Sequence, residues 1–446
     1  MTILNESGVP DVLPPLHAVN GLANRLTGAL VVVVGTRGEA HLVQSLPAAP
    51  TPGLPRSARS ARVASLVLDP EHPPPQGRIA SRVIEAAAGS RGTELVLLVA
   101  GRPAALLGVD ASFEARLISR RLELPALAVD PDAARRAPGS LSTDLQDSVI
   151  AALVDLCPKR RTSDLVETDP PARKLTGGLF GNLLGRSSEE ERPGRGRPVV
   201  LLGAYSSPAA ARELTGDLAR SGVEIAGTVP SPKGLADLPP VGEGTVVAIM
   251  DPNLTTAARA AEERGAKLVR TLMPVGVDGT ARFIRDVALE AGVGANEVVR
   301  ARTVWVDLDP LRNHIRGKRI FFAGDTGVEI PLARFLADAG AVVLEVGAPR
   351  LDRRVLATEL QALGPDVDVV ESPDWRGQLA RIDASRPDVV VASPGLHVPL
   401  IARGHLCRSP HDFLASGPYG YGGSRRILEL FAHTFERAAT LDSVHL

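Results

Sequence analysis

The chain has 446 residues, 44% of them hydrophobic, with 50 basic and 51 acidic side chains and a formal net charge of -1. This composition excludes general disorder and a broad electrostatic nucleic-acid binder, and the length fits about three domains. No apolar run reaches the ~18 residues that a membrane span needs. The first residues also lack the pattern of a secretory signal peptide, in which a basic region is followed by an apolar stretch. We therefore expect a cytoplasmic protein without a membrane span.

Short, continuous runs of Val, Leu and Ile alternate along the chain with Ala- and Arg-rich amphipathic stretches. Continuous apolar runs are typical of parallel strands covered on both faces, and a helix after each strand indicates repeated βαβ units. The sequence thus predicts an α/β fold of three Rossmann-like domains with parallel sheets. The predicted strands are residues 29–36, 63–69, 94–100, 198–204, 245–251, 318–323, 341–347 and 388–393, and predicted helices include 208–221, 255–264, 328–339 and 375–385.

Composition also suggests the domain boundaries. Residues 161–197 are rich in Pro, Gly, Ser and charged side chains, which indicates a flexible linker or insertion between an α/β domain at 1–160 and a second one at 198–310. A third α/β domain, ending in a helix, is predicted at 317–446. Within the linker lies an apolar island, 175–185 (Leu-Thr-Gly-Gly-Leu-Phe-Gly-Asn-Leu-Leu-Gly), which either covers a groove of its own chain or docks a partner.

Three turns that follow predicted strands could carry chemistry. The first contains Glu39, the second Arg102 and the third Asp325, and each opens a helix at the end of a strand. The carboxyl ends of parallel strands are where α/β proteins bind ligands, although an ordinary tight turn is the simpler interpretation. We expect Glu39 and Arg102 to lie near one another, either as an ion pair or as part of a site. The Gly-rich turn with Tyr419 and Tyr421 could approach a ligand or pack the last helix.

Metal ligands are scarce in this sequence. The two cysteines, Cys157 and Cys407, cannot build a disulfide framework, a cysteine-only zinc site or an all-cysteine iron–sulfur site. His405 and His411 flank Cys407 but lack the spacing of a helical zinc motif. We predict no metal bound by residues of this chain alone.

Several segments resemble one protein family in the same order along the chain. Residues 318–325 (Lys-Arg-Ile-Phe-Phe-Ala-Gly-Asp), 329–336 (Glu-Ile-Pro-Leu-Ala-Arg-Phe-Leu) and 345–349 (Glu-Val-Gly-Ala-Pro) resemble the C-terminal domain of the N subunit of dark-operative protochlorophyllide reductase. This subunit belongs to the nitrogenase component 1 superfamily. The other similar segments are 31–45, 239–242, 274–280, 386–388 and 428–431, so that the resemblance spans nearly the whole chain outside the linker.

The resemblance implies a subunit of a nitrogenase-like oxidoreductase complex. In that family, an N-type and a B-type subunit form a heterotetramer, and an ATP-hydrolysing iron–sulfur protein supplies electrons for the reduction of one C=C bond of a tetrapyrrole. The three cysteines that the N-type subunit gives to an interface cluster fall here on Pro14, Glu39 and Arg102. The resemblance therefore implies a divergent member whose own cluster ligands are lost, with any iron–sulfur cluster held by partner subunits.

Three hypotheses follow from these observations. The first is a subunit of a reductase complex with a B-like partner and a tetrapyrrole-like or other conjugated substrate. In it, Glu39 could donate a proton, Arg102 could hold an acidic substituent, and the substrate-binding candidates are Asp325, Tyr419 and Tyr421. The second is a non-redox scaffold or small-molecule-binding homologue, in which Glu39 and Arg102 form a simple ion pair. The third, ranked last, is a sugar-nucleotide transferase that holds phosphate at the glycine turns.

Overall fold

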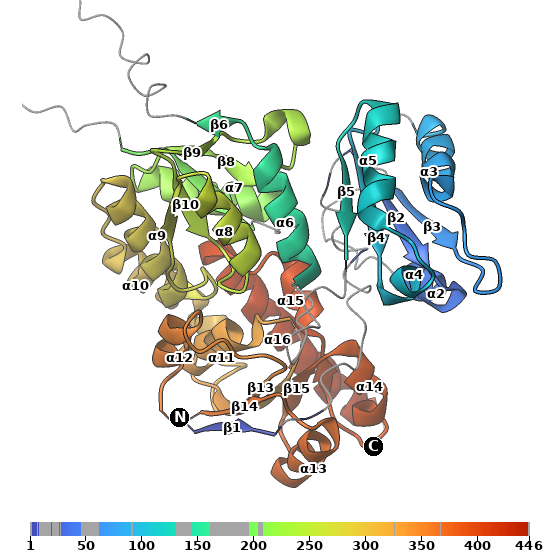
Figure 1. The fold of residues 1–446 in the computed structure, drawn as a ribbon. Helices are drawn as coiled ribbons and strands as arrows, with labels where there is room; N and C mark the ends of the chain where they lie inside the picture. Colours follow the sequence, from blue (N-terminus) through green and yellow to red (C-terminus); the bar gives the residue numbers. More distant parts are fainter. Residues whose placement is uncertain are drawn as a thin grey trace, which may run out of the picture.

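The computed structural model describes residues 2–6, 8, 19, 26, 28–45, 62–90, 92–130, 144–160, 196–203, 208–324, 326–365 and 367–444. Pro14, Asp325 and the apolar island at 175–185 lie outside this range. The described chain forms three parallel sheets of four, four and six strands and a small two-stranded sheet. In Figure 1 the first sheet carries the blue and cyan elements, the second the green ones, and the third mainly the orange and red ones.

The first sheet has the order β3-β2-β4-β5. Alternate residues of its central strands face two different cores, as the pleat of a strand requires: Val32 and Leu98 pack against helices on one face, and Val33 and Leu97 on the other. The elements are β2 (Ala29–Gly35), α2 (Arg37–Ser45), β3 (Arg62–Val67), α3 (Arg78–Ala88), β4 (Leu95–Ala100), α4 (Arg102–Leu106), α5 (Ala111–Leu122) and β5 (Ala126–Val129). The three strands predicted here lie within two residues of the observed bounds.

The second sheet has the order β11-β10-β7-β8, and all its pairs are parallel. Helix α6 (Asp144–Leu156) packs along α8 and shares a core with one face of the first sheet and one face of the second. The other elements are β7 (Val199–Leu202), α7 (Pro208–Arg220), β8 (Ile225–Val229), β10 (Val246–Ile249), α8 (Thr255–Glu263), β11 (Lys267–Val269), α9 (Val277–Ala291) and α10 (Val298–Arg312). A small parallel pair joins β6 (Lys159–Arg160) to β9 (Val241–Gly242).

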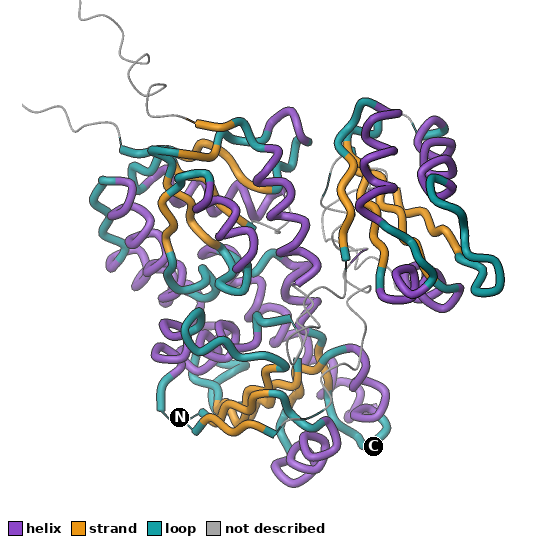
Figure 2. The backbone as a smooth tube through the Cα atoms, viewed as in Figure 1, coloured by secondary structure: helices purple, strands orange, loops and turns teal. Residues whose placement is uncertain are grey.

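The third sheet has the order β1-β14-β13-β12-β15-β16. Its strands lie between helices, which Figure 2 shows as orange strands flanked by purple helices. The strands are β1 (Ile3–Asn5), β12 (Arg319–Ala323), β13 (Val342–Ala348), β14 (Asp368–Glu371), β15 (Val389–Ala392) and β16 (Cys407–Arg408). The helices are α11 (Glu329–Asp338), α12 (Ala357–Leu363), α13 (Trp375–Ser385), α14 (Pro394–Ile401), α15 (Pro410–Ser416) and α16 (Gly420–Val444).

Three elements cross the predicted domain boundaries. Strand β1, from the range 1–160, pairs with β14 of the third sheet, and α6, from the same range, packs on α8 of the second. The long helix α16 leaves the range 317–446 and packs on α7, α9 and α10. The regions are therefore connected by exchanged segments as well as by linkers. Among the described helices, none is long and apolar enough to cross a membrane.

Candidate functional site

Each of the three large sheets has one point at which the strand order reverses. In the first sheet β2 continues to β3 on one side, whereas β4 continues to β5 on the other, so the carboxyl ends of β2 and β4 flank the reversal. The equivalent strand pairs are β7 and β10 in the second sheet and β12 and β15 in the third. Ligands of open α/β sheets bind in the crevice at such switch points, so these three strand ends define the candidate site.

Glu39 and Arg102 stand at the two sides of the first switch point. Val34 of β2 is paired with Ala100 of β4, and the chain then enters α2, with Glu39 in its first turn, and α4, which begins at Arg102. Figure 1 shows α2 and α4 at the same end of this sheet. The structure thus brings together the two elements that carry the predicted site residues, with Glu39 half-buried and Arg102 exposed.

The Glu39 carboxylate closes the start of its own helix. Its Oε2 accepts hydrogen bonds from the Thr36 amide at 2.7 Å and the Thr36 hydroxyl at 3.1 Å, while the Glu39 amide donates to Thr36 Oγ1 at 3.3 Å. This reciprocal arrangement is a capping box. Gly35 is required beside it, because a Cβ at that position would collide with the carboxylate. Glu39 therefore has a structural task, whatever else it does.

The third switch point has a related turn, in which Thr326, three residues before the start of α11, is bonded to Glu329, the first residue of that helix. Thr326 donates from its amide at 3.0 Å and from its hydroxyl at 2.8 Å to Glu329 Oε1, and Gly324 leaves the space that the carboxylate fills. Here the glutamate is only 2% exposed. Across the sheet, His397 lies at the start of α14 with Nε2 3.0 Å from the Ala392 carbonyl oxygen.

The second switch point carries a buried acid that the sequence interpretation missed. Asp251 lies two residues after the end of β10, is 7% exposed, and accepts hydrogen bonds from the amide and the side chain of Asn253 at 2.8 and 3.0 Å. Burial, with a smaller contribution from the charges of Asp147 and Glu329, raises the pKa of Asp251 to about 7. Its position at the end of a predicted strand was the signal available, but no glycine turn drew attention to it.

Two acids of α6 bind other elements, one the start of α8 and the other an arginine that follows β13. Asp147 accepts hydrogen bonds from the Thr256 and Ala257 amides at 2.9 and 2.8 Å, and so caps the start of α8. Burial raises the pKa of Asp147. Asp144 is bound by both terminal nitrogens of Arg350, at 2.6 and 3.0 Å, just beyond β13. The carboxylates of Asp147 on α6, Asp251 after β10 and Glu329 on α11 are therefore close enough to influence one another.

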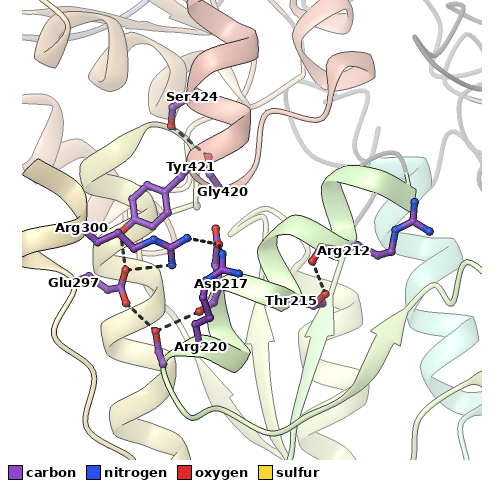
Figure 3. A network of polar contacts seen from close by, with 10 residues as sticks. Arg212, Thr215, Asp217, Arg220, Glu297, Arg300, Gly420, Tyr421 and Ser424 are labelled. Atoms are coloured by element: carbon purple, nitrogen blue, oxygen red, sulfur yellow. Dashed lines mark hydrogen bonds and ion pairs between the residues drawn. The ribbon is translucent and has the colours of Figure 1, made fainter. Parts of the chain in front are cut away.

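Tyr421 belongs to a different polar network, shown in Figure 3. Its hydroxyl donates to Glu297 Oε2 at 2.8 Å, and the Arg300 guanidinium lies 4.6 Å from the centre of its ring. Glu297 also accepts from the Ser221 hydroxyl at 2.7 Å, and Asp217 is paired with Arg300. Burial and the acceptor Glu297 raise the pKa of Tyr421. This network fastens the start of α16 to α7 and α10.

Tyr419 is buried directly before α16, which begins at Gly420. It is 3% exposed and forms an isolated antiparallel bridge with Val275, and the next amide, that of Gly420, donates to the Pro274 carbonyl at 2.8 Å. Tyr419 and Tyr421 thus contact residues that belong to, or directly precede, the helices beside the second sheet. The structure does not bring these two side chains into contact with Glu39 or Arg102 in the described residues.

One cysteine is buried and the other half-buried. Cys157 is 4% exposed just after α6, where burial raises the pKa of its thiol to about 12, and partial burial raises that of Cys407 in β16 to about 11. They belong to two different cores. His405, near Cys407, is hydrogen-bonded to Asp383 at 2.8 Å. Across the described residues, no group of three or more His, Cys, Asp or Glu is arranged to hold a metal ion.

A surface cavity of about 410 Å³ lies between α3 and α5, away from the strand ends just described. It is lined by Arg78 and Arg121 among others and opens near the start of α3. The amides of Gly77 and Ala80 at this helix start already donate to the buried Glu114 carboxylate, at 2.6 and 2.7 Å. Because Glu114 satisfies them, they are not available to an anion.

Comparison with known proteins identifies the family. The model of the family described as nitrogenase component 1 type oxidoreductase matches residues 82–436. The light-independent protochlorophyllide reductase subunit N of Roseiflexus sp. (strain RS-1) is 30% identical over 442 residues, covering 99% of this chain and 95% of that protein. The subunit N of Heliobacterium modesticaldum (strain ATCC 51547 / Ice1) is 30% identical over 433 residues, covering 96% and 94%.

The solved structures agree on the fold. The chain is similar to a structure described as nitrogenase Cp1 at pH 6.5, with a TM-score of 0.63 over 97% of this chain and 93% of that one, at 13% identity. The α/β fold with parallel sheets and the resemblance to subunit N are thereby confirmed, and the sugar-nucleotide transferase hypothesis is set aside. By the family match and by similarity over nearly its whole length, the chain belongs to the nitrogenase component 1 type oxidoreductase family.

Proposed function

We propose that the chain is the N-type subunit of a nitrogenase-like reductase complex that reduces a C=C bond of a tetrapyrrole-like or other conjugated substrate. The observation that carries this proposal is the similarity to light-independent protochlorophyllide reductase N subunits over 99% of the chain. Its partners in the proposal are a B-like homologue and an ATP-hydrolysing iron–sulfur reductase, and its location is the cytoplasm.

The residues at the expected ligand positions do not fit an iron–sulfur cluster. Thiolates are the usual ligands of such clusters, whereas Arg102 is cationic and the Glu39 oxygen Oε2 already accepts two hydrogen bonds. Cys157 is buried in one core and Cys407 is half-buried against another, and their raised pKa values keep the thiols protonated at neutral pH. In this proposal the iron–sulfur ligands of the subunit are lost, and partners hold any cluster.

The proposed substrate region is the crevice at the first switch point. Arg102, exposed at the start of α4, would bind an acidic substituent of the substrate. Both hydrogen bonds to the Glu39 carboxylate use Oε2, so Oε1 is the atom that would carry a proton for transfer to the substrate. Asp325 remains a proposed substrate-binding residue. For Tyr419 and Tyr421, their burial beside the second sheet's helices supports a role in fastening α16 instead.

The complex itself provides the test. The chain would be co-expressed with a B-type homologue from the same genome, purified without oxygen, and analysed for subunit ratio, iron and acid-labile sulfide. We expect a stable complex that contains iron, and no iron on the chain purified alone. Failure to bind any B-type homologue would overturn the N-subunit proposal, and cluster-level iron on the isolated chain would overturn the loss of its ligands.

A proton-donating role for Glu39 predicts that Glu39→Gln lowers the rate of substrate reduction at least tenfold. Gln keeps an oxygen that can accept from Thr36, so the melting temperature should stay within a few degrees of the wild type. The matched control is Glu85→Gln, an exposed glutamate on α3 of the same region. Wild-type activity in Glu39→Gln would end the proton-donor role.

One observation favours the alternative, a non-redox scaffold that binds a small molecule. Neither Glu39 nor Arg102 is a thiolate ligand, and Glu39 serves its own helix. A purified complex that binds protochlorophyllide, contains no iron and reduces nothing with a chemical reductant would support the scaffold over the reductase subunit.

A further inference from the structure

Helix α10 exposes a stripe of apolar and small side chains. Val299 and Val306 are 71% and 68% exposed, and Thr303 and Pro310 are exposed beside them. The four positions are separated by four, three and four residues, so they lie on one face of the helix. Within α10, whose residues are all described, only Ala301 and Leu308 are buried. We call the four exposed residues the α10 stripe.

Two further apolar side chains lie near the start of this helix. Leu289, in the last turn of α9, is 76% exposed, and Val298, the first residue of α10, is 56% exposed. Figure 1 shows α9 and α10 side by side at the outer edge of the second region. A concentration of large exposed apolar side chains on one helix pair is typical of a surface that another segment covers.

The chain re-enters the structure beside this surface. The Arg197 amide donates to the Ala291 carbonyl at the end of α9, at 2.7 Å, and Gly196 lies against the Val293 side chain in the turn from α9 to α10. The segment that begins after Arg160 and lies outside the described residues therefore ends at the helix pair that bears the stripe.

The composition of that segment supplies a suitable occupant. Its large apolar residues are concentrated in the island 175–185, and charged, Pro and Ser residues dominate the chain on both sides. From residue 185 to residue 196 the chain can extend ~36 Å, at ~3.3 Å per residue. Helix α10 is only ~22 Å long. Every point of the stripe is therefore within reach of the island in the same molecule.

We propose that the apolar island 175–185 docks on the α10 stripe of its own chain. A short tether gives the island an effective concentration of the order of millimolar at the stripe, far above that of a second copy at micromolar protein. Intramolecular docking is therefore favoured over pairing of two molecules through the same surface. This inference does not rest on the proposed function, and the iron analysis and the tests below succeed or fail separately.

Cross-linking tests the docking directly in the full chain. Phe180→Cys combined with Val306→Cys, in a Cys407→Ser background because that native thiol is half-buried, would be treated with a short bis-maleimide and mapped by mass spectrometry. The remaining native thiol, Cys157, is 4% exposed and gives little background. The matched control pairs Phe180→Cys with Val398→Cys, which is 76% exposed on α14. We expect an intrachain 180–306 product at least tenfold above 180–398 and independent of protein concentration. Equal yields, or an interchain product that rises with concentration, would overturn the proposal.

A second measurement avoids cysteines. Leu179→Asp with Phe180→Asp should increase amide exchange in the exposed face of α10 at least threefold, because the covering segment is displaced. The matched control places the same two charges outside the island, as Leu165→Asp with Val166→Asp, and should leave exchange in α10 unchanged. Unchanged exchange in the island variant would count against docking.

Discussion

Asp251 is a single residue whose ionisation is linked to the stability of the whole chain. It is 7% exposed, its carboxylate is held by Asn253, and two further acids, Asp147 and Glu329, lie close enough to raise its pKa. In the folded protein the Asp251 carboxyl keeps its proton up to about pH 7, whereas in the unfolded chain it loses that proton near the ordinary pKa of 3.8. The contribution of Asp251 to the free energy of unfolding therefore falls as the pH rises between these two values.

The variant Asp251→Asn should remove that pH dependence. Its amide oxygen can accept from the Asn253 amide as the carboxylate does, without the buried charge. We expect the stability of the variant relative to the wild type to rise by ~3 kcal/mol between pH 5 and pH 8, since about two pKa units of linkage lie in this range and one unit corresponds to ~1.4 kcal/mol. Urea unfolding at both pH values measures this. Parallel pH profiles for the two proteins would show that Asp251 does not hold the proton.

The two Thr–Glu turns show what the sequence could and could not predict at this scale. The pattern Thr-x-x-Glu is legible at 36–39, directly after Gly35, and at 326–329, two residues after Gly324. We read the turns as helix starts, but Glu39 as a chemical group, because spacing does not reveal which atom a carboxylate contacts. The pair Asp144–Arg350 had no sequence signal, since its partners come from α6 and from beyond β13.

At the scale of elements, continuous apolar runs predicted the long buried strands well. They did not predict the short strands that are only half-buried. The run at 29–36 became β2, and the helix predicted at 375–385 has the bounds of α13. Strand β5, of four residues with mixed burial, was missed because it carries neither a long apolar run nor a clear alternation. The last helix was predicted, but its start was not: the sequence placed Tyr421 in a turn before the helix, whereas α16 begins at Gly420 and Tyr421 lies in its first turn.

The Tyr421 hydroxyl should contribute to fastening α16 to α7 and α10. Tyr421→Phe leaves one oxygen of the buried Glu297 without its donor, so we expect a loss of ~1–2 kcal/mol in the free energy of unfolding. Ser81→Ala, which removes an exposed hydroxyl that donates to the Gly77 carbonyl at 2.9 Å at the start of α3, serves as the control and should change stability by under ~0.5 kcal/mol. Chemical denaturation of both variants decides this; equal losses would contradict a fastening role.

At the scale of the whole molecule, a buried ion pair clamps the passage from the second region to the third. Arg334 and Glu359 are 3% and 1% exposed in their side chains and lie 2.9 Å apart. Glu359 accepts from the Met273 amide at 2.6 Å, and Arg334 donates to the Met273 and Val275 carbonyls at 3.3 and 3.1 Å. The clamp thereby ties the chain before α9 to two helices of the third region.

Glu359→Gln should strongly destabilise the protein, because it leaves the buried Arg334 charge without its counterion. We expect a loss of ~3 kcal/mol or more in the free energy of unfolding. Glu436→Gln breaks an exposed pair with His433 at 3.4 Å and should cost under ~1 kcal/mol. Thermal and urea unfolding of the two variants provide the comparison, and similar small losses would show that the clamp contributes little.

The placement of β1 has a consequence for the order of events during synthesis. Ile3 pairs with Val369, and Glu6 is bound by Arg381 beside β14. The ribosome makes β1 before the strands of the first two sheets, yet its neighbour β14 emerges only after both of those sheets have been translated. A nascent chain must therefore keep this segment unpaired while the first two sheets assemble, and the outer edge of the third sheet is completed only once β14 has emerged.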